Sequence, residues 1–205
     1  MEIIVNSSFK TYTLMKRILL LALLVGSMVP AFAGDKNAAD DSKIHWMNMD
    51  DVQTAMKKEP RKVLIDVYTG WCGWCKRMDA TTYESPEVAK YINQNFYAVK
   101  LDAERKDSLR FAGKMYGYSA NDKANTVALE LLHGQMSYPT TVFMEKGFQM
   151  ITAVPGYLTV PQVELVLKYL GEDKYKTVKW EDYQKDFKGT WAEVATPSAP
   201  MQGAH

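Results

Sequence analysis

The sequence is poor in the residues from which small proteins build cross-links and metal sites. Its 205 residues include two cysteines and three histidines. Two cysteines form at most one intramolecular disulfide, so a scaffold held by several disulfides is excluded. A tetrahedral zinc site needs four ligands, and the chain offers only His45, His133 and His205 beyond the cysteines. We expect no metal and interpret His45 and His133 as ordinary surface or packing residues.

An excess of charge is also absent. The chain carries 25 Lys+Arg and 24 Asp+Glu, a net charge of +1. Without residues 1–33 the net charge becomes about −1. Neither value favours nucleic acid or an acidic membrane surface as a partner.

Long apolar runs are missing, apart from one near the N-terminus. There, basic Lys16 and Arg17 precede an apolar stretch, residues 18–25, and Ala31-Phe32-Ala33 fits a small-x-small cleavage site. The stretch is short for a membrane span. We expect residues 1–33 to be a signal peptide, with Met15 as an alternative start. The protein is then exported, soluble in a periplasmic or extracytoplasmic space, and not stably associated with the membrane. A short buried or amphipathic helix is the alternative.

The two cysteines lie together in the run Trp71-Cys72-Gly73-Trp74-Cys75-Lys76, directly after a strand-like segment. A Cys-x-x-Cys pair at a helix N-terminus lowers the pKa of the first thiol and keeps a resolving thiol nearby. This spacing predicts a dithiol redox enzyme. A structural disulfide and half of a metal site are the alternatives, whereas haem attachment would need histidine at Lys76.

The hydrophobic pattern alternates between strands and helices and then ends in a hairpin and further helices. Strands are expected at 63–68, 96–101, 140–144 and 149–154. Helices are expected at 44–58, 73–78, from Pro86, 106–116, 126–132, 160–170 and 179–187. This order predicts an α/β fold with a central mixed sheet flanked by helices.

Three segments are distinguished along the chain beyond the predicted signal peptide. Residues 34–43 are polar and small and are expected to form a flexible leader. Residues 44–195 are expected to form a single domain. Residues 196–205 are rich in proline, alanine and serine and are expected to be disordered.

From residue 63 to residue 171, the chain resembles the thioredoxin superfamily. It most resembles the exported thioredoxin-like thiol:disulfide oxidoreductases, which include the C-terminal domain of the transmembrane thiol:disulfide interchange reductase. Several motifs agree in order and spacing with this family. They are Asp66 six residues before Cys72, Trp71 before that cysteine, Lys100 on the second strand, Tyr138-Pro139-Thr140 as the cis-proline loop, and Gly156 after the last strand.

The resemblance implies roles for the redox pair and its neighbours. Cys72 is expected to be the exposed attacking nucleophile, and Cys75 the buried thiol that resolves the mixed disulfide. Asp66 lies in an apolar run, so burial should raise its pKa and suit it to accept the Cys75 proton. Capping of a nearby backbone group is the alternative for Asp66. Lys100 either tunes Asp66 or extends to solvent.

The resemblance also implies a substrate groove. Pro139 is expected to be cis, to block metal access, and to let the Tyr138 backbone pair with a substrate strand. Trp71, Trp74 and Tyr138 are expected to form an apolar rim for an extended or unfolded substrate. Trp74 should be exposed, whereas packing around the loop is equally consistent with Trp71.

Two features depart from the minimal family pattern. The dipeptide inside the motif is Gly73-Trp74, where thioredoxin has Gly-Pro. Between Leu101 and Pro139 lie 37 residues, more than a minimal thioredoxin needs, so we expect a helical insert. Residues 179–191 form a C-terminal extension, which carries apolar residues at helical spacing.

The sequence therefore predicts an exported protein-disulfide reductase with no cofactor. Its partners are expected to be disulfide-containing protein substrates and an unidentified redox partner protein. Two alternatives stay open: an oxidase or isomerase of the same fold, and a non-catalytic binding or chaperone adaptor.

Overall fold

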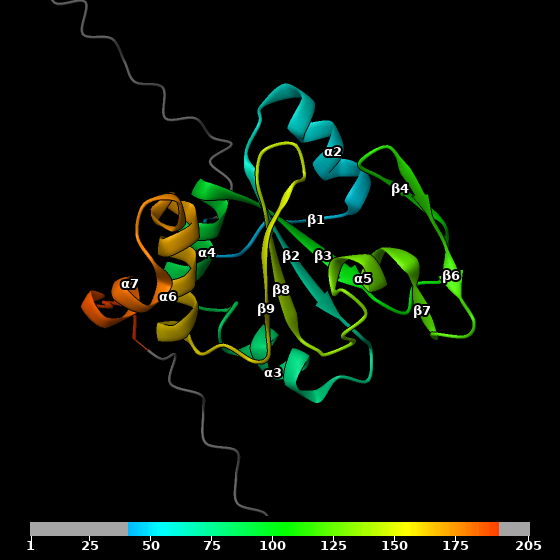
Figure 1. Ribbon diagram of the computed structural model, residues 1–205. Helices are drawn as coiled ribbons and strands as arrows, with labels where there is room; N and C mark the ends of the chain where they lie inside the picture. The colour runs from blue at the N-terminus through cyan, green and yellow to red at the C-terminus, as the bar shows by residue number, and fades with distance from the viewer. Residues whose placement is uncertain (1–40, 193–205) are drawn as a thin grey trace, which may run out of the picture. The chain divides into compact units, whose positions relative to one another are not determined.

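A computed structural model describes residues 41–192, and its centre is a five-stranded sheet (Figure 1). The strand order is β1-β3-β2-β8-β9. Strands β1, β3 and β2 run parallel, while β8 is antiparallel to β2 and β9 is antiparallel to β8. The strands are β1 (Trp46–Met47), β2 (Lys62–Tyr68), β3 (Phe96–Asp102), β8 (Thr140–Met144) and β9 (Met150–Pro155).

Strand β2 is central because its sequence suits burial on both faces. Six of its seven residues are buried, as expected for a continuous β-branched and aliphatic run between two neighbouring strands. Its side chains alternate between two cores. Val63, Ile65 and Val67 face one core, whereas Leu64 faces the other. Since Asp66 has the same parity as Leu64, it lies on the Leu64 face.

Helices cover both faces of the sheet. Helices α2 (Met49–Lys58) and α5 (Thr126–Leu131) contribute to the core that contains Val63. The opposite core receives residues from α3 (Gly73–Ala80), α4 (Pro86–Asn95) and α6 (Val160–Gly171). In Figure 1, α4 and α6 lie together, away from α2 and α5. The predicted mixed sheet flanked by helices is confirmed.

The helix starts follow local capping chemistry that is visible in the sequence. The Asn48 side chain accepts hydrogen bonds from the first backbone N–H groups of α2. Ser85 caps α4, and Pro86 occupies its first helical position, where a missing N–H is tolerated. At α6, the Thr159 N–H donates to the Gln162 side chain over 2.9 Å, as in a capping box.

One helix prediction was wrong at its start, and another was wrong altogether. Residues 46–47 form β1, which pairs with β3, so the first helix begins only at Met49. Residues 106–116 contain no helix: β4 (Leu109–Phe111) and β5 (Lys114–Tyr116) form a hairpin. Ala112 and Gly113 both have positive φ, 47° and 82°, which is the geometry of a two-residue type I′ turn.

The insert before the cis-proline loop therefore combines strands with a helix. A second short hairpin, β6 (Tyr118–Ser119) with β7 (Ala124–Asn125), follows the first, and the expected helix α5 comes after it. Beyond α6, a 3₁₀ turn (Lys174–Lys176) leads to helix α7 (Trp180–Asp186), which confirms the helical extension.

Several expectations concern parts of the chain outside the described residues. These are the signal peptide at 1–33, most of the leader at 34–43, and the tail at 196–205. Within residues 41–192, no helix is both long and apolar enough to cross a membrane.

Candidate active site

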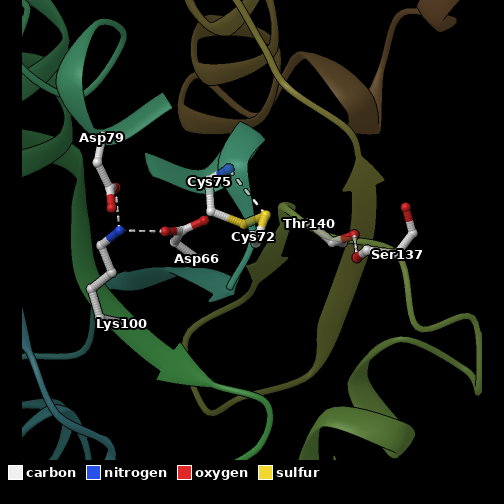
Figure 2. Close-up of a disulfide and its surroundings, with 7 residues drawn as sticks. All are labelled: Asp66, Cys72, Cys75, Asp79, Lys100, Ser137 and Thr140. Atoms are coloured by element: carbon white, nitrogen blue, oxygen red, sulfur yellow. Dashed lines mark hydrogen bonds and ion pairs between the residues drawn. A yellow bond between two sulfur atoms is a disulfide. The ribbon is translucent and has the colours of Figure 1, made fainter. Parts of the chain in front are cut away.

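The two cysteines form a disulfide at the start of α3, just beyond the carboxyl end of the central strand β2. Cys72 is the N-cap residue of α3, and Cys75 lies in the first turn. The backbone N–H of Cys75 donates to the Cys72 sulfur over 3.0 Å (Figure 2). The positive end of the helix dipole stabilises a thiolate at this position, so reduced Cys72 is placed to act as a nucleophile.

The expectation that Cys72 is exposed was wrong for this oxidised state. Cys72 is 4 % exposed, almost the same as Cys75 at 3 %. Its sulfur is bonded to the Cys75 sulfur and accepts the Cys75 N–H, so it turns inward over the first turn of α3. Burial of Cys75 agrees with the prediction.

Asp66 and Lys100 meet beside the disulfide because they are register partners on β2 and β3. Lys100 Nζ lies 2.6 Å from Asp66 Oδ2, and it also forms an ion pair with Asp79 on α3. Figure 2 shows Asp66 between Lys100 and the disulfide. Of the two uses considered for Lys100, contact with Asp66 is therefore the one present in the structure.

The electrostatics of Asp66 are dominated by burial. The residue is 1 % exposed, and its Oδ1 atom has no hydrogen-bond partner within the described residues. Burial raises the pKa of this carboxyl, while the ammonium of Lys100 opposes the rise and the charge of Asp79 adds to it. The raised pKa agrees with the prediction. An unpartnered oxygen with raised proton affinity is suited to accept a proton.

Lys100 is held by more than its two carboxylates. Its Nζ lies 4.8 Å from the ring centre of Trp46, 5.2 Å from that of Tyr68 and 5.4 Å from that of Tyr83. Burial lowers the pKa of this ammonium, but Asp66 and Asp79 outweigh burial and raise it. Lys100 therefore stays charged next to Asp66.

Loop residues opposite the disulfide form the other wall of the site. The Tyr138–Pro139 peptide bond is cis, as predicted. The Pro139 carbonyl accepts the Gly156 N–H over 2.8 Å, and Thr140 Oγ1 donates to the Ser137 carbonyl over 2.8 Å (Figure 2). These bonds tie the loop to both strands of the β8–β9 hairpin at its open end.

Exposed aromatic side chains flank the disulfide. Trp71 is 67 % exposed, and its ring centre lies 6.0 Å from that of Tyr138. Trp74 is 58 % exposed, in agreement with the prediction, and its ring centre lies 5.5 Å from that of Tyr157. The structure therefore pairs two of the predicted rim residues, Trp71 and Tyr138, and pairs the third, Trp74, with Tyr157.

Sequence reasoning missed three residues at this site. Asp79 lies one helical turn after Cys75, and this i, i+4 spacing could have indicated it. Arg77 lies three residues after Trp74 on α3, a spacing that could also have indicated it. Tyr157 gave no such signal, because its contacts with Trp74 and Arg77 join α3 to the segment after β9. Within residues 41–192, no three His, Cys, Asp or Glu side chains form a group that could hold a metal ion.

The mixed sheet, the Cys-x-x-Cys at the start of α3 and the cis-proline opposite define the protein class. It has a thioredoxin-like fold with a dithiol site of the kind that supports thiol–disulfide exchange.

Comparison with known proteins identifies the family within this class. Residues 36–165, more than half of the chain, match the family model Thioredox_DsbH, described as a protein of unknown function, DUF255. The chain belongs to this family.

Individual relatives agree with this assignment. The chain is 35 % identical over 86 residues to the putative protein disulfide-isomerase C1F5.02 of Schizosaccharomyces pombe, covering 40 % of this chain and 17 % of that protein. It is 32 % identical over 47 residues to the thiol:disulfide interchange protein DsbD of Pectobacterium atrosepticum, covering 23 % and 8 %. The chain thus spans less than a fifth of either relative.

A solved structure supports the fold. A thioredoxin-fold protein from Helicobacter pylori superposes with a TM-score of 0.50 at 22 % identity. The match covers 72 % of this chain and 89 % of that one.

Proposed function

We propose that this protein is an exported reductase of protein disulfides, with Cys72 and Cys75 as its dithiol. The observation that carries the proposal is the redox pair at the start of α3, with a buried carboxyl of raised pKa beside it. Export is supported by the basic and apolar leader and its small-x-small site, and it would place the enzyme where substrate disulfides persist.

The reaction begins from the reduced pair. The Cys72 thiolate attacks one sulfur of the substrate disulfide, that S–S bond breaks, and the other substrate sulfur leaves as a thiolate that takes up a proton. Cys75 then loses its proton and attacks the Cys72 sulfur, which releases the second substrate sulfur. Two electrons pass to the substrate, and the enzyme is left with the Cys72–Cys75 disulfide.

Asp66 is the proton acceptor for Cys75 in this scheme. Its Oδ1 atom has no partner among the described residues, and its raised pKa makes it a stronger base than an ordinary carboxylate. Lys100 and Asp79 are positioning residues, because they act on the charge of Asp66 and do not touch the sulfurs. A cavity of about 310 Å³ beside this group is lined in part by Asp79, Tyr83 and Lys100.

Regeneration of the dithiol requires a reducing partner. A second protein with a more reducing dithiol attacks the Cys72–Cys75 disulfide. The Cys72–Cys75 pair is reduced, and the dithiol of the second protein is oxidised to a disulfide. The flanking aromatic residues Trp71, Trp74 and Tyr138 offer an apolar contact surface for both substrate and partner.

The reduction potential of the Cys72–Cys75 pair tests the direction of electron flow. The purified protein is equilibrated with glutathione or dithiothreitol buffers, and the fraction of free thiol is measured by alkylation. We expect a value of about −270 mV or lower, as in reducing thioredoxins. A value of about −120 to −180 mV would identify an oxidase or isomerase and overturn the proposed direction. Absence of any disulfide turnover would favour the adaptor alternative.

A further inference from the structure

Each of the two aromatic pairs that flank the disulfide contacts a charged residue, and the two charges have opposite signs. Trp74 and Tyr157 lie with Arg77, whereas Trp71 and Tyr138 lie with Glu104. We refer to these as the Arg77 end and the Glu104 end of the rim. Apolar contact explains the aromatic side chains but not this separation of charge.

The Arg77 end presents a guanidinium that no carboxylate of the described residues neutralises. Its Cζ atom lies 5.6 Å from the ring centre of Trp74 and 5.8 Å from that of Tyr157. The Tyr157 hydroxyl lies 3.0 Å from Thr81 Oγ1, which anchors this ring to the end of α3. Within residues 41–192, Arg77 has no ion-pair partner. Stacked arginine keeps its planar fork of donors available for a carboxylate.

The Glu104 end presents negative charge. Glu104 Oε1 accepts the indole N–H of Trp71 over 3.1 Å, and the Glu104 N–H donates to Asp102 Oδ1 over 2.9 Å. Neither carboxylate forms an ion pair in the described part of the chain. Burial, Glu104 and Asp102 together raise the pKa of Tyr138 to about 12, which agrees with a negative potential at this end.

Both ends are connected to the loop that faces the disulfide. Tyr138 precedes Pro139 directly, and Tyr157 follows Gly156, whose N–H donates to the Pro139 carbonyl. Trp71 and Trp74 are in turn the residues that precede Cys72 and Cys75. A segment lying over the disulfide therefore has access to both ends.

We propose that the rim selects substrate segments by the order of their charges. The preferred segment is extended, with an acidic side chain near its cysteine toward the Arg77 end and a lysine or arginine toward the Glu104 end. This inference rests on the proposed function, because it assigns the substrate class of the same site. It goes further by predicting that reversal of the charge order weakens binding.

The test uses synthetic disulfide-linked peptides as substrates of the full-length reduced protein. Two charged peptides share one composition around a central cysteine, Glu-x-Cys-x-Lys and its reverse Lys-x-Cys-x-Glu, and a third, Gln-x-Cys-x-Gln, is neutral. We expect kcat/KM for the two charged orders to differ on the order of 10-fold, with the neutral peptide between them. The difference should shrink at high salt, because exposed charges are screened.

Charge-swapped variants decide whether these residues cause the preference. The double variant Arg77→Glu with Glu104→Arg should invert the order of the two charged peptides. If the double variant folds poorly, the milder single variants Arg77→Gln and Glu104→Gln replace it. Each of them should reduce the preference for one charge order. Lys146→Glu is the matched control, because this exposed residue lies in the β8–β9 turn, at the far end of β8 from Pro139, and should keep the wild-type order.

Two negative outcomes are distinguishable. If the wild type reduces all three peptides within about twofold of one another, or if the swap leaves the order unchanged, the charge-selection inference is wrong and the reductase function stands. If none of the peptides is reduced while the pair itself cycles in dithiothreitol, the proposed function fails and the inference fails with it.

Discussion

Asp66 and Glu164 are both buried carboxylates, one beside the disulfide and one under the C-terminal extension, and their surroundings differ in a single respect. Asp66 Oδ2 contacts Lys100, and Oδ1 has no partner in the described part of the chain. Both oxygens of Glu164 accept hydrogen bonds, from Thr190, Trp191 and Lys168.

This difference in hydrogen bonding gives Asp66 and Glu164 pKa shifts in opposite directions. Burial raises the pKa of Asp66, and Lys100 does not fully offset it. Burial also favours a higher pKa for Glu164, but hydrogen bonds from Lys168, Trp191 and Thr190 outweigh burial and lower it. Burial alone therefore does not decide the charge of a carboxyl; the number of donors that reach it does.

The two carboxylates consequently have different roles. Glu164 joins α6 to the segment after α7, and the fit is close: a Cβ added at Gly189 would lie 2.9 Å from Glu164 Oε2. A fully satisfied carboxylate stabilises the fold. At Asp66, one oxygen next to the sulfurs has no partner among residues 41–192, which is unfavourable for stability and useful for proton transfer.

Removing the nucleophile should have the largest effect. Cys72→Ser has no thiolate to attack a substrate disulfide, so we expect turnover to be abolished in a disulfide-reduction assay. Cys75→Ser is the matched control: it should still attack and accumulate a mixed disulfide that mass spectrometry detects, because the resolving thiol is missing. Retention of turnover by Cys72→Ser would contradict the proposed mechanism.

Asp66→Asn removes the proton acceptor while keeping the size of the side chain. We expect resolution of the mixed disulfide to slow by about 100-fold, the lower end of general-base contributions. Rapid-mixing kinetics with a fluorescent disulfide substrate measure this step separately from the first attack. The first attack by Cys72 serves as the internal control. An unchanged rate of resolution would show that another group takes the Cys75 proton.

The same variant should raise stability at neutral pH. The folded pKa of Asp66 lies above the value of 3.8 for a free carboxyl, so the folded protein binds this proton more tightly than the unfolded chain. The contribution of Asp66 to stability therefore falls as pH rises from the unfolded pKa through the folded pKa, and the deficit is complete above the folded pKa. In thermal melts, the melting temperature of Asp66→Asn should exceed that of the wild type at pH 7. The difference between the two melting temperatures should shrink toward pH 4.

Glu164→Gln should lower stability at neutral pH, whereas Asp66→Asn should raise it. Loss of the charge weakens the bonds from Thr190, Trp191 and Lys168, and we expect a loss of about 1–3 kcal/mol in the free energy of unfolding at pH 7. Because the folded pKa is lowered, this stability is present above pH 4.5 and is lost as pH falls through the folded value. Reductase activity should be retained. If Glu164→Gln is as stable as the wild type at pH 7, the proposed difference between a stabilising Glu164 and a destabilising Asp66 is wrong.

The smallest effect is expected from Asp79→Asn. The negative charge of Asp79 raises the pKa of Asp66 and shares its ion-pair partner Lys100. Without it, the pKa of Asp66 should fall, and the acid limb of the pH–rate profile for resolution should move to lower pH by less than about one unit.

Glu84→Gln is the control for this shift. Glu84 lines the same cavity as Asp79 but pairs with Lys43 and not with Lys100. Equal shifts in the two variants would mean that the cavity as a whole, and not the Asp79–Lys100 ion pair, controls Asp66.

Predictions about local structure succeeded where neighbours in sequence determine it. The buried strand β2 and the helix after Cys72 both follow from local chemistry or from one apolar run. The hairpin at 109–116 was expected to be part of a helix, whereas its turn at Ala112-Gly113 has positive φ at both residues.

The sequence alone determined the class of chemistry, because two cysteines separated by two residues at a helix start suit thiol–disulfide exchange. It also indicated that Asp66 would be buried. Only the tertiary structure decided what reaches each charged group: Asp79 next to Lys100, Arg77 over Trp74 and Tyr157, and Thr190 and Trp191 on Glu164. Most of these contacts join segments far apart in the chain, and a charged group's pKa depends on the distances to its neighbours in space, which the order of residues does not contain.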